Sequence, residues 1–136
     1  MKEFKLTVVE ADSKFYEGNC ISLVVPTSAG QYGVMAGHSN MVAAIVPGIL
    51  KYSLPDGERR HAAISGGVVK VENNEVLILG DSIESPDEID ANRAKRELEK
   101  AKNAMSDKLT DEEYSKAKAQ MTKAVNRLNV ISRYTK

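Results

Sequence analysis

The stretch ESPDEIDANRAKRELEKA, Glu84–Ala101, marks the point where strand-like sequence gives way to helix-like sequence. It begins with a typical helix start, because Ser85 suits the N-cap, Pro86 the first helical position and Glu88 the third. Apolar residues then recur at steps of three and four, which is the spacing of one helix face. We therefore expect a boundary between two modules after residue 83.

A second helix is predicted after the polar segment SDKLTDEE, where Thr110 and Glu113 form another capping box. The apolar seams of the two helices comprise Ala91, Ala94, Leu98, Ala101 and Met105, then Tyr114, Ala117, Met121, Ala124, Leu128 and Ile131. A short link between two such helices predicts an antiparallel hairpin over residues 84–136. Alanine dominates the seams and contributes only about 0.8 kcal/mol per buried methyl group. We expect a marginally stable hairpin, suited to switching between two packings.

Residues 1–83 have the pattern of short strands separated by turns. The segment FKLTVV alternates apolar and polar residues, as a half-buried strand does. The turns PDG at Pro55–Gly57 and ENNE at Glu72–Glu75 predict two hairpins. The runs CISLVV and EVLIL are expected to be covered on both faces. An antiparallel β-sandwich or barrel followed by a helical hairpin, an α+β fold, is therefore predicted.

Charge and composition limit the partners of the chain. The formal net charge is zero, although the last 21 residues hold six Lys or Arg side chains and no acid. A nucleic-acid binder is a competing interpretation of this basic segment, but the helical region offers only Tyr114 and Tyr134 to stack on bases. We expect no nucleic-acid partner. The longest apolar run is interrupted by Pro47 and Gly48, so membrane association is expected only through a partner.

No constellation of residues predicts catalysis or a metal site. The phosphate-binding loop, the nucleophile elbow and the zinc-protease motif are all absent from the sequence. His38 and His61 are the only histidines, which is too few for an ordinary zinc site with one cysteine. The single cysteine, Cys20, excludes an intrachain disulfide and is expected to be a small buried apolar residue. We expect a protein that is not an enzyme, with no catalytic residue and no required cofactor.

Three segments, in order along the chain, resemble the epsilon subunit of the bacterial F-type ATP synthase. GVMAGHSNMVAAIVPG resembles the family's Gly-x-x-Pro-Gly-His segment, and AISGGVVKVENNEVLIL resembles its Ser-Gly-Gly strand and hairpin. IDANRA and KAVNRLNVI resemble its C-terminal helix pair. Ala36 and Asn40 stand where the family usually has proline, which is expected to alter loop rigidity. The resemblance spans nearly the whole chain and implies an N-terminal sandwich of about ten strands before the hairpin.

The resemblance also implies a function. The chain would be a rotor subunit of the central stalk, peripheral to the cytoplasmic face of the bacterial plasma membrane. Its sandwich would bind the gamma subunit and the c-subunit ring, with Gln31 facing the ring and His38 lying toward gamma. The hairpin, when extended, would reach the alpha and beta catalytic subunits and inhibit ATP hydrolysis. A non-catalytic adaptor that docks an unrelated partner is the alternative interpretation.

Some members of this family bind ATP on the folded hairpin through a motif that IDANRA resembles. Carried over residue by residue, the implied ATP site comprises Glu84, Asp90, Arg93, Lys100, Lys123 and Arg127. The two lysines stand where ATP-binding members can have arginine, and lysine lacks the planar fork that binds phosphate through two hydrogen bonds. The alternative for Asp90 and Arg93 is an ordinary surface ion pair worth about 0.2–0.5 kcal/mol, with Asp90 also suited to the positive N-terminus of the helix.

Overall fold

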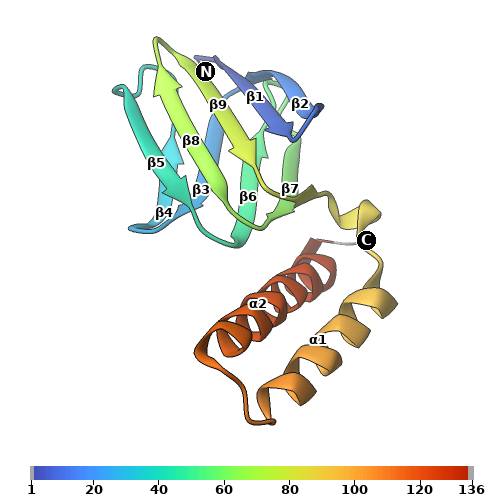
Figure 1. Cartoon of the computed structure of the whole chain (residues 1–136). Coiled ribbons are helices and arrows are strands. Elements are labelled where there is room, and N and C mark those ends of the chain that lie inside the picture. The colour runs from blue at the N-terminus through green and yellow to red at the C-terminus, as the bar shows by residue number, and fades with distance from the viewer. Residues whose placement is uncertain (1, 135–136) are drawn as a thin grey trace. The chain divides into compact units, whose positions relative to one another are not determined.

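The computed structural model describes residues 2–134 and separates them into two compact units that meet between Glu84 and Ser85 (Figure 1). The first unit contains ten strands and the second contains a short 3₁₀ turn and two α-helices. The predicted α+β fold, with a sandwich of about ten strands before a helical hairpin, is therefore confirmed. The strands are β1 (Phe4–Glu10), β2 (Ser13–Cys20), β3 (Ser22–Thr27), β4 (Gly30–Val34), β5 (Met41–Ile45), β6 (Gly48–Ser53), β7 (Arg59–Ile64), β8 (Gly67–Glu72), β9 (Glu75–Gly80) and β10 (Ile83–Glu84).

The strands form one hydrogen-bonded path that folds over the core. Their order is β10-β7-β6-β3-β5-β8-β9-β1-β2, and β4 pairs with β3. Every pairing is antiparallel except that of β1 with β9, which is parallel. Alternation along β1 buries Phe4, Leu6 and Val8 as predicted. The core between the layers is apolar, and its largest fully buried side chains include Leu23, Leu50, Ile64 and Ile78.

The tight turns form where the sequence predicts them. The segment Pro55–Gly57 joins the paired strands β6 and β7, and Gly57 has φ +93°. Asn73 and Asn74 join β8 to β9 with φ values of 52° and 63°, a left-handed conformation that asparagine tolerates. Glycine is required at residue 67, because a Cβ there would lie 2.0 Å from the carbonyl oxygen of Leu79. The first turn thus connects the β6–β7 hairpin, and the second connects the β8–β9 hairpin.

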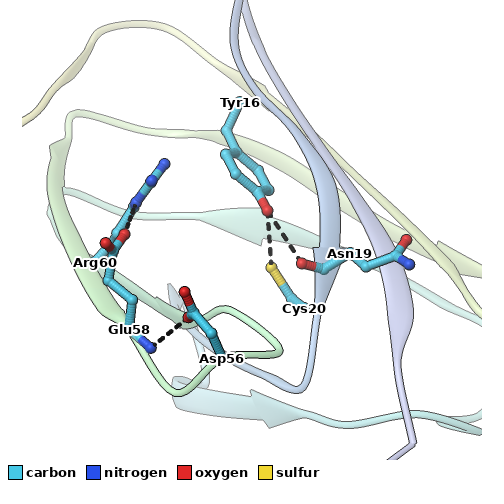
Figure 2. Close-up of polar contacts among 6 residues, drawn as sticks. All are labelled: Tyr16, Asn19, Cys20, Asp56, Glu58 and Arg60. Atoms are coloured by element: carbon cyan, nitrogen blue, oxygen red, sulfur yellow. Dashed lines mark hydrogen bonds and ion pairs between the residues drawn. The ribbon is translucent and has the colours of Figure 1, made fainter.

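An aromatic cluster brings together residues of β2, β6 and β7, and Figure 2 shows two of them, Tyr16 and Arg60. The rings of Tyr16 and Tyr52 lie 4.9 Å apart, and the guanidinium carbon of Arg60 lies 5.7 Å from the centre of the Tyr16 ring. The Tyr16 hydroxyl donates to the carbonyl oxygen of Asn19 at 3.1 Å, and the Cys20 thiol lies 3.8 Å from that hydroxyl. Burial raises the pKa of the Cys20 thiol and raises the pKa of Tyr16 to about 12. The cysteine is fully buried, as expected, and acts as an apolar packing residue.

One prediction about the strands is wrong. The run EVLIL in β9 is not covered on both faces, because its residues alternate and Leu79 is 50% exposed. Val68 of β8, which pairs directly with Leu79, is 41% exposed, and Val42 of β5 is 68% exposed on the same outer face. An antiparallel sheet needs only one face against the core, whereas parallel packing between helices covers both. We call Val42, Val68 and Leu79 the outer apolar patch.

The helical unit begins differently from the prediction. The residues Pro86–Glu88 form the 3₁₀ turn η1, not the first turn of an α-helix, although the Ser85 hydroxyl and backbone N–H both contact the Glu88 carboxylate at 2.7 and 3.2 Å. The chain becomes extended again at Ile89. Asp90 then caps the helix α1 (Ala91–Met105). A second N-cap residue so close to the first therefore divides the expected helix start into two separate elements.

The helix α2 (Asp111–Tyr134) begins with the predicted capping box. The Glu113 backbone N–H donates to the Thr110 hydroxyl at 3.1 Å, and the Thr110 N–H donates to the Glu113 carboxylate at 3.2 Å. Figure 1 shows α1 and α2 lying side by side in opposite directions. No helix within residues 2–134 is long and apolar enough to cross a membrane.

Alanine forms the buried seam of the hairpin, as the sequence predicts. Ala94 and Ala101 of α1 and Ala117 and Ala124 of α2 are all buried. The predicted seam residue Tyr114 is instead exposed, because it lies on the first turn of α2, beyond the closely packed part of the pair. Small residues therefore form most of the seam and let the two helices approach closely, although Val130, which the predicted seam did not include, is also buried.

Candidate functional site

A polar groove of about 350 Å³ runs between the two helices. Its lining residues are Arg93, Glu97, Lys100, Gln120, Lys123 and Arg127. Four of the six side chains are cationic, and Glu97 is the single acid among them. The side chains that line the groove therefore carry a net positive charge, and clusters of cationic side chains bind phosphate groups.

Helical periodicity explains how these residues meet. On α1 the lining residues Arg93, Glu97 and Lys100 follow one another at steps of four and three. On α2 the residues Lys123 and Arg127 are four apart, and Gln120 precedes Lys123 by three. Side chains at these spacings project from one face of a helix. The antiparallel pairing places the two faces opposite each other, so residues about 30 positions apart line one groove.

Glu97 joins the two arginines of the groove. Its Oε1 atom accepts from the Nε of Arg93 at 3.0 Å, and its Oε2 atom accepts from an Nη of Arg127 at 3.0 Å. The first contact lies within α1, whereas the second links α1 to α2. The carboxylate thus uses one oxygen for each guanidinium group. A single side chain orients both arginines and ties the helices together across the groove.

Asp90 and Arg93 do not form the surface ion pair considered as an alternative. Asp90 instead accepts the backbone N–H of Arg93 at 3.0 Å and acts as the N-cap of α1. The Arg93 guanidinium pairs with Glu97, one turn further along the helix. The ion-pair part of the alternative is therefore wrong within the described residues, whereas the expected place of Asp90 at the helix N-terminus is confirmed, because its carboxylate accepts a backbone N–H of the first turn.

The structure distributes the six residues of the implied ATP site unequally. Arg93, Lys100, Lys123 and Arg127 line the groove together, while Asp90 supports the start of α1. Glu84 belongs to the sandwich unit, where it ends β10 and pairs with Ala63 of β7. The residues that line the groove do not include Glu84.

Sequence reasoning missed two lining residues, Glu97 and Gln120. A usable signal for Glu97 is its position four residues after Arg93, on the same face of α1. Gln120 lies one turn before Lys123 on α2 and could have been found in the same way. Both residues were missed because the resemblance motif does not contain them. Across residues 2–134, no group of three or more His, Cys, Asp or Glu side chains is arranged to hold a metal ion.

The two residues implied in subunit contacts lie in one region of the sandwich. Gln31 is exposed on β4, and His38 is half-buried in the loop between β4 and β5. The His38 ring meets the Tyr32 ring edge-on with centroids 5.4 Å apart, and its Nδ1 lies 2.7 Å from the carbonyl oxygen of Ser39. The loop is tied to the β8–β9 turn, because Asn40 accepts the backbone N–H of Asn73 at 3.1 Å.

The structure defines a class of protein before any relative is considered: a β-sandwich followed by a two-helix hairpin with a cationic groove. Residues 3–86 match the family model for the beta-sandwich domain of the ATP synthase delta/epsilon chain. Residues 87–132 match the model for the long alpha-helix domain of the same chain. The chain belongs to the delta/epsilon chain family of ATP synthase. It is therefore a non-catalytic subunit type, as the resemblance implied.

Similar proteins cover the chain almost completely. An ATP synthase epsilon chain from Ruminococcus albus is 39% identical over 134 residues, 98% of this chain and 99% of the relative. One from Caldicellulosiruptor bescii is 38% identical over 130 residues, 96% of this chain and 94% of the relative. A chain in the Euglena gracilis mitochondrial ATP synthase aligns with a TM-score of 0.79 at 24% identity, covering 88% of this chain and 76% of that one. The last comparison supports the fold.

Proposed function

We propose that this chain is a rotor subunit of the central stalk of an F-type ATP synthase, and that its hairpin inhibits ATP hydrolysis unless ATP holds it folded. The family supports the rotor assignment, since two curated relatives of nearly equal length are epsilon chains. The groove supports the response to ATP, and one observation carries it: two antiparallel helices bring four cations together around one cavity. No single helix presents all four.

A nucleotide that binds across both helices can control whether the hairpin is folded. A phosphate chain that contacts Arg93 on α1 and Arg127 on α2 needs the two helices side by side. If the helices separate, the ligand loses half of its cationic contacts. A ligand shifts an equilibrium by the difference between its affinities for the two states. ATP in this groove therefore favours the folded hairpin and disfavours an extended one.

The extended hairpin is the inhibitory state in this proposal. The packed seam consists mostly of alanine, so separating the helices exposes little apolar area per residue. The second helix carries a basic surface that suits the acidic surfaces of partner proteins. We infer that, once extended along gamma, this helix contacts the alpha and beta catalytic subunits and blocks rotation in the direction of hydrolysis.

The sandwich is the part that joins the stalk. The outer apolar patch of Val42, Val68 and Leu79 offers an apolar surface for the gamma subunit. The loop region with Gln31 and His38 would contact the c-subunit ring and gamma, respectively. The chain would then lie at the cytoplasmic face of the bacterial plasma membrane, held there through the complex.

The response to ATP is tested by calorimetric titration of the full chain with ATP and Mg²⁺. We expect a saturable heat that is lost in Arg93→Ala. Arg96→Ala is the matched control, because Arg96 is exposed on the same helix but does not line the groove. If the wild-type chain gives no heat up to millimolar ATP, the nucleotide response is excluded and inhibition must come from subunit contacts alone.

The rotor assignment is tested by coexpression with the gamma subunit of the same ATP synthase. We expect the two chains to copurify, and Leu79→Glu to weaken the complex, because it places a charge in the outer apolar patch. Ser13→Glu adds the same charge at an exposed position of β2 and serves as the control. If wild-type chain and gamma do not associate, a sandwich adaptor with another partner becomes the better assignment.

A further inference from the structure

The cationic groove already contains an anion that belongs to the chain. The two oxygens of the Glu97 carboxylate each accept one hydrogen bond of 3.0 Å, from Arg93 and from Arg127. A phosphate group binds arginine in the same manner, through separate oxygens on separate donors. Glu97 is the single acid among the residues that line the groove. Its carboxylate therefore uses one nitrogen donor of each arginine and offsets part of the positive charge that an anionic ligand needs.

We propose that Glu97 is a built-in competitor that sets how much nucleotide the groove requires before it fills. This inference rests on the proposed nucleotide response of the hairpin. When the groove is empty, Glu97 holds both arginines and links α1 to α2. When a triphosphate enters, its oxygens take over Arg93 and Arg127, and the carboxylate must release them. The binding free energy measured for the ligand is then the difference between the contacts that the ligand makes with the two arginines and the contacts of the Glu97 carboxylate that it displaces.

The two contacts of Glu97 differ in their shielding from water. The Arg93 side chain is 72% exposed, whereas those of Arg127 and Glu97 are 26% and 36% exposed. Water and salt screen an exposed pair strongly, so the contact to Arg93 contributes little. The contact to Arg127 is the more shielded one, and it is also the one that joins the helices. Releasing Arg127 from Glu97 is therefore the main event that a ligand has to bring about.

The competitor also weakens the control that a ligand has over the hairpin. The link from Glu97 to Arg127 already favours the folded hairpin without any ligand. A nucleotide that replaces this link stabilises the folded hairpin only by the amount by which its own contacts are stronger than those of the carboxylate. Removing the carboxylate should thus have two opposite effects. The empty hairpin loses a contact between its helices, and the ligand no longer competes with a carboxylate for Arg93 and Arg127.

A purely structural ion pair makes a different prediction. If Glu97 only orients the arginines for the ligand, its neutralisation leaves affinity unchanged or lowers it. If Glu97 competes with the ligand, neutralisation raises affinity. Glu97→Gln keeps the size and the hydrogen-bonding shape of the side chain while removing its charge. Glu99→Gln is the matched control, because Glu99 is exposed on α1, outside the groove, and makes the same change in net charge.

The experiment is calorimetric titration of the full-length wild type, Glu97→Gln and Glu99→Gln with ATP and Mg²⁺, repeated with inorganic tripolyphosphate. We expect Glu97→Gln to bind both probes about three- to tenfold more tightly than wild type, with Glu99→Gln close to wild type. Amide hydrogen exchange of the empty proteins should show faster exchange in α1 and α2 of Glu97→Gln.

The outcomes separate this inference from the proposed function. If wild type binds ATP and Glu97→Gln binds no more tightly than Glu99→Gln, the competitor role is overturned and the nucleotide response stands. If only Glu97→Gln binds, the competitor role is supported, and ATP does not regulate the natural chain. If neither protein binds either probe, both the nucleotide response and the competitor role are overturned.

Discussion

The side-chain Oδ1 of Asn74 accepts the backbone N–H of Gly37 at 2.8 Å, which ties the loop containing His38 to the turn between β8 and β9. The same asparagine donates from its Nδ2 to the carbonyl oxygen of Glu3 at 3.0 Å. A second hydrogen bond joins the same two segments with the acceptor in the loop, because the side chain of Asn40 accepts the backbone N–H of Asn73. Two asparagines in a turn thus hold a loop 33 to 37 positions away in the sequence.

Asn74→Gly should release this loop without disturbing the turn. Glycine adopts the positive φ of residue 74 easily, so only the side-chain hydrogen bonds are lost. We expect a loss of about 1 kcal/mol of stability and faster amide exchange at Gly37 and His38. Asn73→Gly, with the same change at the neighbouring residue, keeps both Asn74 bonds. Equal exchange rates in the two variants would show that the Asn74 side chain does not hold the loop.

Gly67→Ala should unfold or severely destabilise the sandwich. Residue 67 has φ +142°, and a Cβ there would lie 2.0 Å from the carbonyl oxygen of Leu79 in the paired strand. We expect a loss of about 3 kcal/mol or more. Gly57→Ala is the control, because its φ of +93° is also unfavourable but no atom lies within 4 Å of the added Cβ. Denaturant unfolding monitored by circular dichroism compares the two, and a similar loss in both would argue against the clash.

Ala124→Leu should separate the hairpin helices. Ala124 is fully buried in the seam, and additional methyl groups there force the close-packed helices apart. We expect a loss of about 1–3 kcal/mol, seen as faster amide exchange in α1 and α2. Ala119→Leu places the same side chain on the exposed face of α2. Unchanged exchange in Ala124→Leu would mean that the seam can accommodate bulk, contrary to the close approach described above.

The stability of β6 and β7 should fall as the pH drops below about 6.5, and His61 should account for part of the loss. Burial lowers the pKa of His61 in the folded chain, and the charges of Lys51 and Arg59 lower it further. Between the folded-state and the unfolded-state pKa of His61, the unfolded chain binds more protons than the folded chain. The free energy of unfolding therefore rises as the pH rises through this range.

Amide exchange of the two strands between pH 5.5 and 7.5, corrected for intrinsic rates, measures this effect in wild type and His61→Gln. The difference in stability between the two proteins should shift in favour of His61→Gln as the pH falls. A difference that stays constant over this range would exclude His61 as the titrating group.

Local chemistry made much of the fold predictable. The capping box of Thr110 and Glu113, the asparagine turn at Asn73 and Asn74, and the alternation along β1 are interactions between residues close in sequence. Their physical causes act over one to four residues, so the sequence shows them directly. The division of the helix start at Ile89 was missed because two capping residues compete within six positions, and the sequence does not show which one prevails.

The groove was predictable only in part. The resemblance supplied Arg93, Lys100, Lys123 and Arg127, all of which the structure brings together. The sequence did not indicate Glu97 as a groove residue, because its link between the helices depends on Arg127, 30 positions away. The outer apolar patch was missed for a similar reason, since exposure of Leu79 depends on which face of β9 meets the core.

The sequence by itself determined the class of fold, the turns, the helical periodicity and the family of this protein, because each depends on local spacing or on residues in a fixed order. Only the tertiary structure decided that Glu97 bridges two arginines, one on each helix. The contact between Glu97 and Arg127 depends on a distance that the pairing of α1 with α2 creates, and chain order does not specify that distance.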